Sequence, residues 1–124
     1  MKQLTKAEEQ VMQILWSINE GVVKDLVDNF EEPRPAYTTV ATVLKVLETK
    51  GFVAKKKIGK TYLFSPSITK NDYTHFQFST LLSNYFNGSF PKMATFFARE
   101  NKLSISELEE MMKMAEEELK KDNK

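Results

Sequence analysis

The chain has 124 residues, 41% of them hydrophobic, and a formal net charge of only +1. These values indicate a globular protein of one or two small domains, and no apolar run is long enough to cross a bilayer, so membrane insertion is not expected. The absence of cysteine excludes disulfides, thiolate metal sites and cysteine nucleophiles, and it favours the cytoplasm.

Two helices are expected at the N-terminus. Thr5-x-x-Glu8 has the form of a capping box, which begins a helix. Apolar residues then recur at helical spacing, and these are Val11, Ile14, Leu15 and Ile18. Gly21 follows the end of this helix, and a second, shorter apolar stripe comes after it. Its members are Val23, Leu26, Val27 and Phe30.

A third helix is expected from about Tyr37, after the break that Pro33 and Pro35 impose. Its buried stripe consists of Val40, Val43, Leu44 and Leu47. At 100° per residue, the opposite face carries small, polar and weakly basic side chains. They are Thr38, Thr42, Lys45 and Thr49, with Thr39 and Ala41 on the flanks. Gly51 is suited to a left-handed cap at the end of this helix.

Beyond Gly51 the period changes from helix to strand. Residues 52–57 and 61–65 are predicted to form two short strands joined by a turn that contains Gly59. Three helices followed by a two-stranded hairpin are typical of a winged helix-turn-helix. We therefore predict a mainly α fold with a small β-hairpin, in which residues 1–67 form the winged-helix domain.

The third helix and the hairpin together favour DNA binding. Threonine and lysine can bind phosphate oxygens and base edges in a major groove. From Arg34 to Lys70, eight basic residues stand against a single acid, Glu48, a net charge of +7. The hairpin carries four of these bases, Lys55, Lys56, Lys57 and Lys60. On a wing such lysines would neutralise phosphates. The alternative is a solvated helix face beside a solvated loop.

Residues 68–124 are predicted to form three further helices. This segment is rich in aromatic residues, yet about 55 residues make only a thin core, so we expect a second copy of the chain to complete it. The alternative is one core shared with the first domain. The residues expected to dimerise are Phe78, Leu82, Tyr85, Phe96, Leu108 and Met112.

Other kinds of site find little support. His75 is the only histidine and has no cysteine or clustered acids beside it, so we interpret it as a surface or interface residue. The four glycines are far apart, so no phosphate-cradling loop is expected. We therefore expect no enzyme activity, no metal and no cofactor.

The chain resembles the penicillinase-repressor (BlaI/MecI/CopY) family from Leu4 to about Glu118. The segments that carry the resemblance are "LTKAEEQVMQILW", "YTTVATVLKVLETKGFV", "KIGKTYLFSP" and "NGSFPKMATFFARENKLSISELEEM". The resemblance implies a homodimeric winged-helix repressor that binds an inverted-repeat operator. The DNA contacts that it implies are Tyr37, Thr38, Thr39, Thr42, Lys45, Lys57 and Lys60, to which the hairpin composition adds Lys56.

The sequence also departs from the family. The copper-responsive branch has a C-terminal cysteine cluster, which this chain lacks, so copper sensing is not expected. Many relatives have a polar or basic residue at Ala41 and an arginine at Val46, so the family's operator core need not apply. Staphylococcal members are cleaved at an Asn-Phe bond, and the matching pair here is Phe96-Phe97. A membrane-bound sensor protease is the partner that such cleavage implies.

Two functions from different classes are thus open. The first is a dimeric repressor that binds double-stranded operator DNA and catalyses nothing. The second is a winged-helix module whose exposed face binds a protein instead of DNA. Steep salt dependence is expected only of the first.

Overall fold

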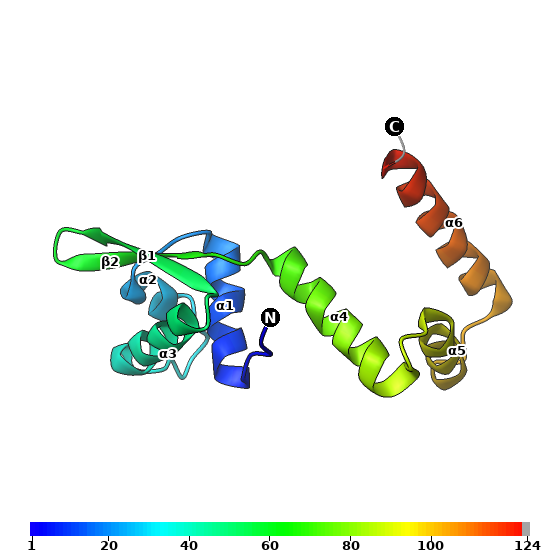
Figure 1. Cartoon of the computed structure of the whole chain (residues 1–124), viewed down its shortest axis with the longest axis horizontal. Coiled ribbons are helices and arrows are strands. Elements are labelled where there is room, and N and C mark those ends of the chain that lie inside the picture. The colour runs from blue at the N-terminus through cyan, green and yellow to red at the C-terminus, as the bar shows by residue number, and fades with distance from the viewer. Residues whose placement is uncertain (123–124) are drawn as a thin grey trace. The chain divides into compact units, whose positions relative to one another are not determined.

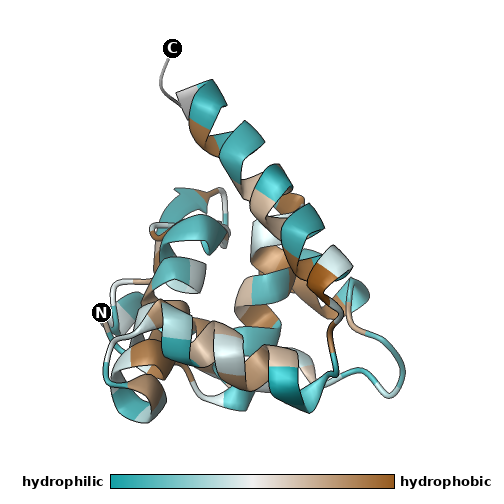
Figure 2. Ribbon diagram, turned by 90° about the vertical axis from the view of Figure 1, so that its right-hand side faces the viewer, coloured by the Kyte–Doolittle hydropathy of each residue, from teal (hydrophilic) through white to brown (hydrophobic). Residues whose placement is uncertain are grey.

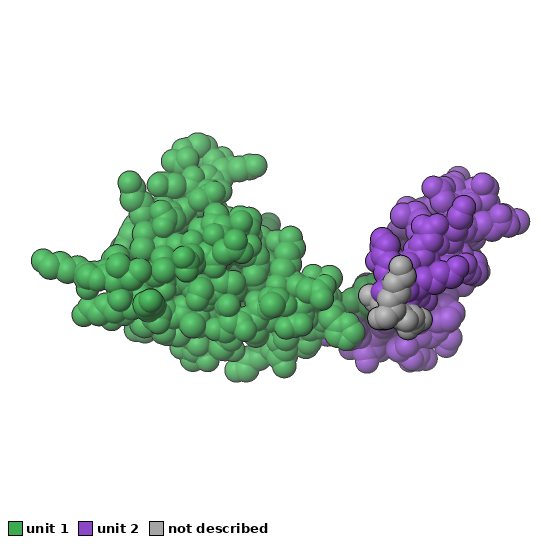
Figure 3. Space-filling model, turned by 90° about the horizontal axis from the view of Figure 1, so that it is seen from above, with its two compact units in different colours: residues 1–78 green, residues 79–124 purple. Residues whose placement is uncertain are grey.

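The computed structural model describes residues 1–122 and divides into two compact units, Met1–Phe78 and Ser79–Lys124 (Figure 3). Figure 1 labels the helices and strands in chain order. They are α1 (Lys6–Ile18), α2 (Val23–Asp28), α3 (Tyr37–Thr49), β1 (Val53–Ile58), β2 (Thr61–Pro66), α4 (Lys70–Phe86), α5 (Phe90–Glu100) and α6 (Ile105–Asp122). The expected order, three helices, a hairpin and three helices, is confirmed.

The first unit has a continuous apolar core built by α1, α2, α3 and the hairpin. The predicted capping box is present, since Glu8 N donates to Thr5 Oγ1 and Thr5 N donates to Glu8 Oε1. Met12 is fully buried, whereas Ile14 is only half-buried, so the buried stripe of α1 is rotated slightly from the one expected. The largest fully buried side chains are Phe52, Met12, Leu15, Leu26, Leu44, Leu47 and Val40.

The hairpin has one face toward this core. Its antiparallel register pairs Lys55 with Phe64 and Lys57 with Tyr62, and side chains directly opposite each other share a face. Phe64 is buried, so Lys55, Lys57 and Tyr62 lie on the core-side face of the hairpin. Gly59 has φ +60° in the two-residue turn, as a type II′ hairpin turn requires at its first position.

Gly21 has a role that the sequence did not indicate. Gly21 and Phe64 form an isolated antiparallel bridge, with Gly21 N to Phe64 O at 3.0 Å and Phe64 N to Gly21 O at 2.8 Å. A Cβ on Gly21 would lie 2.9 Å from Ile18 Cδ1 and 3.1 Å from Asp25 Cβ. The close approach of α1, α2 and β2 therefore requires glycine here.

The first compact unit ends at Phe78 and contains the first half of α4, whereas the sequence analysis drew the domain boundary at residue 67. Tyr73 is buried, and its hydroxyl accepts a hydrogen bond from Leu4 N at 2.9 Å. Its ring lies 5.9 Å from Trp16 and 5.7 Å from Phe52, centroid to centroid. The sequence placed the boundary where the period changes, but Tyr73 fills the core between segments distant in sequence.

The second unit is helical and thinly packed. None of its described side chains, from residue 79 to residue 121, is buried. The rings of Phe86 and Phe96 lie 5.6 Å apart, centroid to centroid. In α6, the helix nearest the label C in Figure 2, hydrophobic and hydrophilic residues occupy different sides of the helix. Within residues 1–122, no helix is both long and apolar enough to span a membrane.

Candidate nucleic-acid interface

The face of α3 opposite the core is exposed as the periodicity predicted. Val40, Leu44 and Leu47 are buried. The exposed residues of the helix are Tyr37, Thr38, Thr39, Thr42, Lys45, Val46 and Thr49. No acidic residue lies in the first turn of α3, and its N-cap, Ala36, offers no side-chain hydrogen bond. Thr39 N donates to Ala36 O at 3.1 Å, so the first-turn amides left available to an anion are those of Tyr37 and Thr38.

The threonines on this face differ in what they present to solvent. Thr42 Oγ1 donates to Thr38 O at 2.9 Å, and Thr49 Oγ1 donates to Lys45 O at 3.2 Å. Because each of these hydroxyl protons is already used, Thr42 and Thr49 present oxygen lone pairs and methyl groups outward. Such a surface can accept hydrogen bonds from adenine or cytosine amino groups and contact thymine methyls.

The ion pairs divide the basic residues into two sets. Lys50 Nζ lies 2.7 Å from Glu8 Oε1, and Lys55 Nζ lies 3.3 Å from Glu48 Oε1. Arg34 Nε lies 3.7 Å from a Glu32 oxygen. Among the described residues, no ion-pair partner is present for four lysines of α3 and the hairpin. These are Lys45, Lys56, Lys57 and Lys60.

The hairpin lysines without partners point in different directions. Lys57 shares the core-side face with Tyr62, whereas Lys56 is paired with Leu63 and lies on the opposite face. Lys60 is in the turn, next to Gly59. Lys55 reaches Glu48 of α3 from the core-side face, so this is the face nearer α3. Lys57 is therefore better placed than Lys56 to share a ligand with α3.

The buried carboxylate of Glu8 was missed by the sequence analysis except as part of the capping box. Burial by itself would raise the pKa of Glu8, but hydrogen bonds from the Lys50 ammonium and Thr5 amide outweigh it and hold the pKa below its usual range. The ion pair joins the first turn of α1 to the end of α3. Lys50 therefore stabilises the fold and is not available to a ligand.

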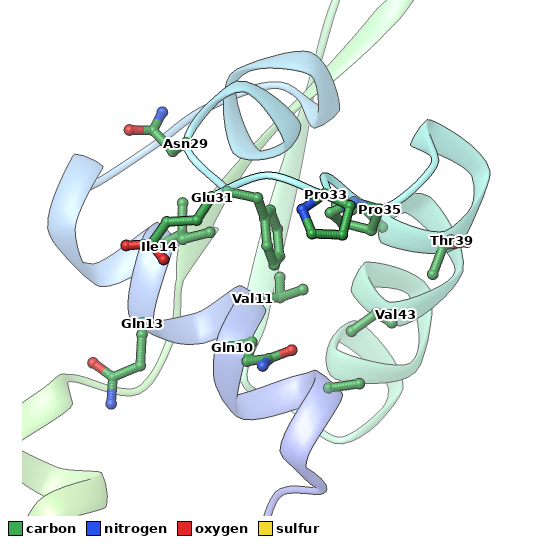
Figure 4. Close-up of a pocket in the computed structure, with 13 residues that line it drawn as sticks. Gln10, Val11, Gln13, Ile14, Asn29, Glu31, Pro33, Pro35, Thr39 and Val43 are labelled. Carbon is green, nitrogen blue, oxygen red and sulfur yellow. The ribbon is translucent and has the colours of Figure 1, made fainter.

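A cleft of about 690 Å³ adjoins α3 (Figure 4). Its walls come from α1, from the loop before α3 and from α3 itself, and they include Val11, Phe30, Pro33 and Val43. Thr39 lies at its α3 side, so this predicted contact lies on the flank of the exposed face. Among residues 1–122, no cluster of side chains suited to a metal ion is present.

The residues expected to dimerise are accessible. Tyr85, Phe96 and Met112 have exposed fractions of 76%, 54% and 65%, whereas Leu82 and Leu108 are half-buried. Phe78 is the last residue of the first unit and is 39% exposed. The candidate cleavage pair, Phe96 and Phe97, lies within α5, and both side chains are exposed.

Comparison with known proteins agrees with this geometry. The sequence profile of the penicillinase repressor family matches residues 4–117. The chain belongs to the penicillinase repressor family. The penicillinase repressor of Bacillus licheniformis is 30% identical over 120 residues, which are 93% of this chain and 91% of the relative.

Other members of the penicillinase repressor family are similar along most of the chain. The methicillin resistance regulatory protein MecI of Mammaliicoccus sciuri is 23% identical over 110 residues, 88% of this chain and 89% of the relative. The solution structure of the DNA-binding domain of the repressor BlaI matches with a TM-score of 0.50 and 25% identity. The match covers 57% of this chain and 88% of that domain. This structural similarity confirms the winged-helix fold of the first unit. The family consists of transcriptional repressors, which are not enzymes.

Proposed function

We propose that this chain is a cytoplasmic, dimeric repressor that occupies an inverted-repeat operator through α3 and the hairpin wing. The observation that carries the proposal is the division of the lysines. Lys50 and Lys55 are paired inside the protein, whereas Lys45, Lys57 and Lys60 have no ion-pair partner in residues 1–122. Lysines that have no ion-pair partner and lie beside a polar helix can bind the phosphates of a DNA backbone.

The wing and α3 have different roles in DNA recognition. The lysines of the wing and Lys45 neutralise phosphates and supply affinity without regard to sequence. Thr38 and Thr42, in the middle of the exposed face of α3, lie against base edges and supply preference for a sequence. Tyr37 and Thr39 flank this face and contact the backbone at its border.

The exposed side chains of the second unit support dimerisation. Its described side chains have no buried core, and they include exposed Tyr85, Phe96 and Met112. Large apolar side chains left in water are unfavourable, and a second copy of the same helices would cover them with two-fold symmetry. Two α3 helices related in this way would read half-sites separated by about one or more turns of DNA.

Proteolysis would inactivate such a repressor by dividing the dimer interface. A cut between Phe96 and Phe97 would separate α6 from the first half of α5, so neither part would keep the whole shared surface. The exposure of both rings supports access, although α5 must unwind for a protease to bind an extended chain. A membrane-bound sensor protease is the proposed partner.

Selection of bound duplexes from a random-sequence pool tests the proposed function. We expect enrichment of an inverted repeat, binding of two chains per duplex, and an affinity that falls linearly in the logarithm of salt concentration. A chain that lacks the charges of Lys45, Lys57 and Lys60 serves as the control and should enrich nothing. Absence of enrichment together with salt-independent capture of a protein would favour the interaction module instead.

A further inference from the structure

One ammonium group connects the wing to the end of α3. Lys55 Nζ lies 3.3 Å from Glu48 Oε1 and 4.6 Å from the centroid of the Tyr62 ring. Lys55 is in β1, Tyr62 is in β2, and both lie on the core-side face of the hairpin. An ion pair and a cation–π contact thus meet at one side chain and tie three elements together.

The position of Glu48 gives this contact its importance. Glu48 is the only acid between Arg34 and Lys70, and it lies in α3, where a free carboxylate would repel DNA phosphates. Lys45, three residues earlier on the same helix, makes no ion pair with it in the described structure. Glu48 is therefore neutralised from the wing, and Lys45 keeps its charge for solvent or a ligand.

The pair is partly shielded. The side chains of Glu48 and Lys55 are 35% and 37% exposed, less than those of the Arg34–Glu32 pair, so salt screens their attraction less than it screens fully exposed charges. The Tyr62 ring covers part of the ammonium, because a cation is attracted to the face of an aromatic ring. These two partners fix the Lys55 side chain and, with it, the base of the wing.

We propose that Lys55 is a positioning residue that orients the wing against α3, and that it does not itself contact phosphate. The inference rests on the proposed function and assigns a role within it. The core-side face of the wing carries Lys57 and Tyr62, so holding this face toward α3 lets Lys57 and the helix contact the same duplex. Without Lys55 the hairpin would be less restrained in the free protein, so DNA binding would have to order the wing before Lys57 reaches the same phosphate.

The test uses the full chain and the duplex enriched above, with binding measured by fluorescence anisotropy over a range of salt concentrations. The variant Lys55→Met removes the charge but keeps the length of the side chain. We expect about three- to ten-fold weaker binding with an unchanged salt slope, because no phosphate contact is lost. Lys55→Arg can keep both the ion pair and the ring contact, so this variant should bind the duplex with wild-type affinity.

Amide hydrogen exchange of the free protein gives a second readout that needs no DNA. Exchange along β1 and β2 should be faster than in the wild type in both Lys55→Met and Glu48→Gln. The double variant should exchange no faster than Lys55→Met, because the ion pair that Glu48→Gln removes is already absent there. Lys56→Met is the matched control, since Lys56 lies on the opposite face of the hairpin, and it should leave this exchange unchanged.

Two results would overturn the inference. One is a salt slope lowered by about one in Lys55→Met, which would make Lys55 a phosphate contact. The other is wild-type exchange and affinity in that variant, which would make the side chain dispensable. Failure of the proposed function would look different, because then neither the wild type nor Lys57→Ala would show salt-dependent DNA binding.

Discussion

Lys50 Nζ donates to both oxygens of Glu8, at 2.7 Å and 3.0 Å, across 42 positions of the chain. Glu8 is buried and begins α1, whereas Lys50 caps the end of α3. The pair therefore fixes the start of one core helix against the end of another. Removing one partner would leave the other charge poorly solvated.

The Glu8 ion pair should make the stability of the first unit depend on pH. Folding lowers the pKa of Glu8 from its ordinary value of 4.5, so the ion pair contributes fully to stability above pH 4.5, and this contribution is lost as the pH falls through the lower folded pKa. Glu8→Gln should reduce the free energy of unfolding at neutral pH by about 1–3 kcal/mol. Urea denaturation at several pH values measures both effects.

Glu9→Gln is the matched control for this substitution, because Glu9 neighbours Glu8 and has no ion-pair partner in residues 1–122. It should change the free energy of unfolding by less than about 0.5 kcal/mol. The difference between wild type and Glu8→Gln should shrink as the pH is lowered below 4.5. A difference that stays constant would show that the carboxylate charge has no role.

Gly21→Ala should destabilise the winged-helix unit. The added methyl would lie 3.1 Å from Asp25 Cβ, so α2 must shift, and the bridge from Gly21 to Phe64 would lengthen. We expect a loss of about 1–3 kcal/mol in the free energy of unfolding, measured by chemical denaturation.

Gly51→Ala separates the steric cost of an added methyl from the conformational cost, because Gly51 has φ +83° but open space around it. The free energy of unfolding should fall by about 1–2 kcal/mol in this variant. Wild-type stability in Gly21→Ala would contradict the close packing.

The two faces of the wing should contribute unequally to DNA binding. Lys57 lies on the core-side face and Lys56 on the opposite face. Lys57→Ala should weaken binding to all duplexes about equally and lower the salt slope by about one, whereas Lys56→Ala should have a smaller effect on both. Anisotropy titrations over a salt series measure the slopes. Equal slopes for wild type and Lys57→Ala would remove the core-side face from the interface.

Thr42→Glu should abolish operator binding while the protein stays folded. Thr42 is exposed in the middle of the polar face of α3, so the carboxylate would meet phosphates and base acceptors without disturbing the core. Thr42→Gln has nearly the same shape without the charge and should retain measurable binding with altered base preference. Circular dichroism checks the fold. Wild-type affinity in a folded Thr42→Glu variant would show that α3 is not the element that contacts the bases of the operator.

Truncation should separate folding from dimerisation. A fragment of residues 1–78 keeps Tyr73 and the whole core of the first unit, so it should fold as a monomer. It should bind DNA far more weakly than the full chain, because in a dimer the first bound subunit holds the second at a high effective concentration near its half-site. A fragment of residues 1–67 lacks Tyr73 and should be less stable. Analytical ultracentrifugation measures the mass, and a monomeric full-length chain at micromolar concentration would contradict the dimer.

Local sequence signals determined the elements of this protein. The capping box of Thr5 and Glu8, the stripe that ends at Leu47 and the turn at Gly59 each depend on residues within a few positions, so they can be recognised before the fold is known. The exposed face of α3 follows from the same periodicity. The order of these elements was enough to predict a winged helix.

Only the tertiary structure decided which partners those residues have. Tyr73 joined the first unit because its ring meets Trp16 and Phe52, more than 20 positions away in the chain, and no change of period marks such a contact. By sequence, Lys50, Lys55 and Lys57 are equivalent members of one basic segment. Packing brought carboxylates to the first two and left Lys57 without one among residues 1–122. The charge that a lysine can offer to DNA therefore depends on what the fold places beside it.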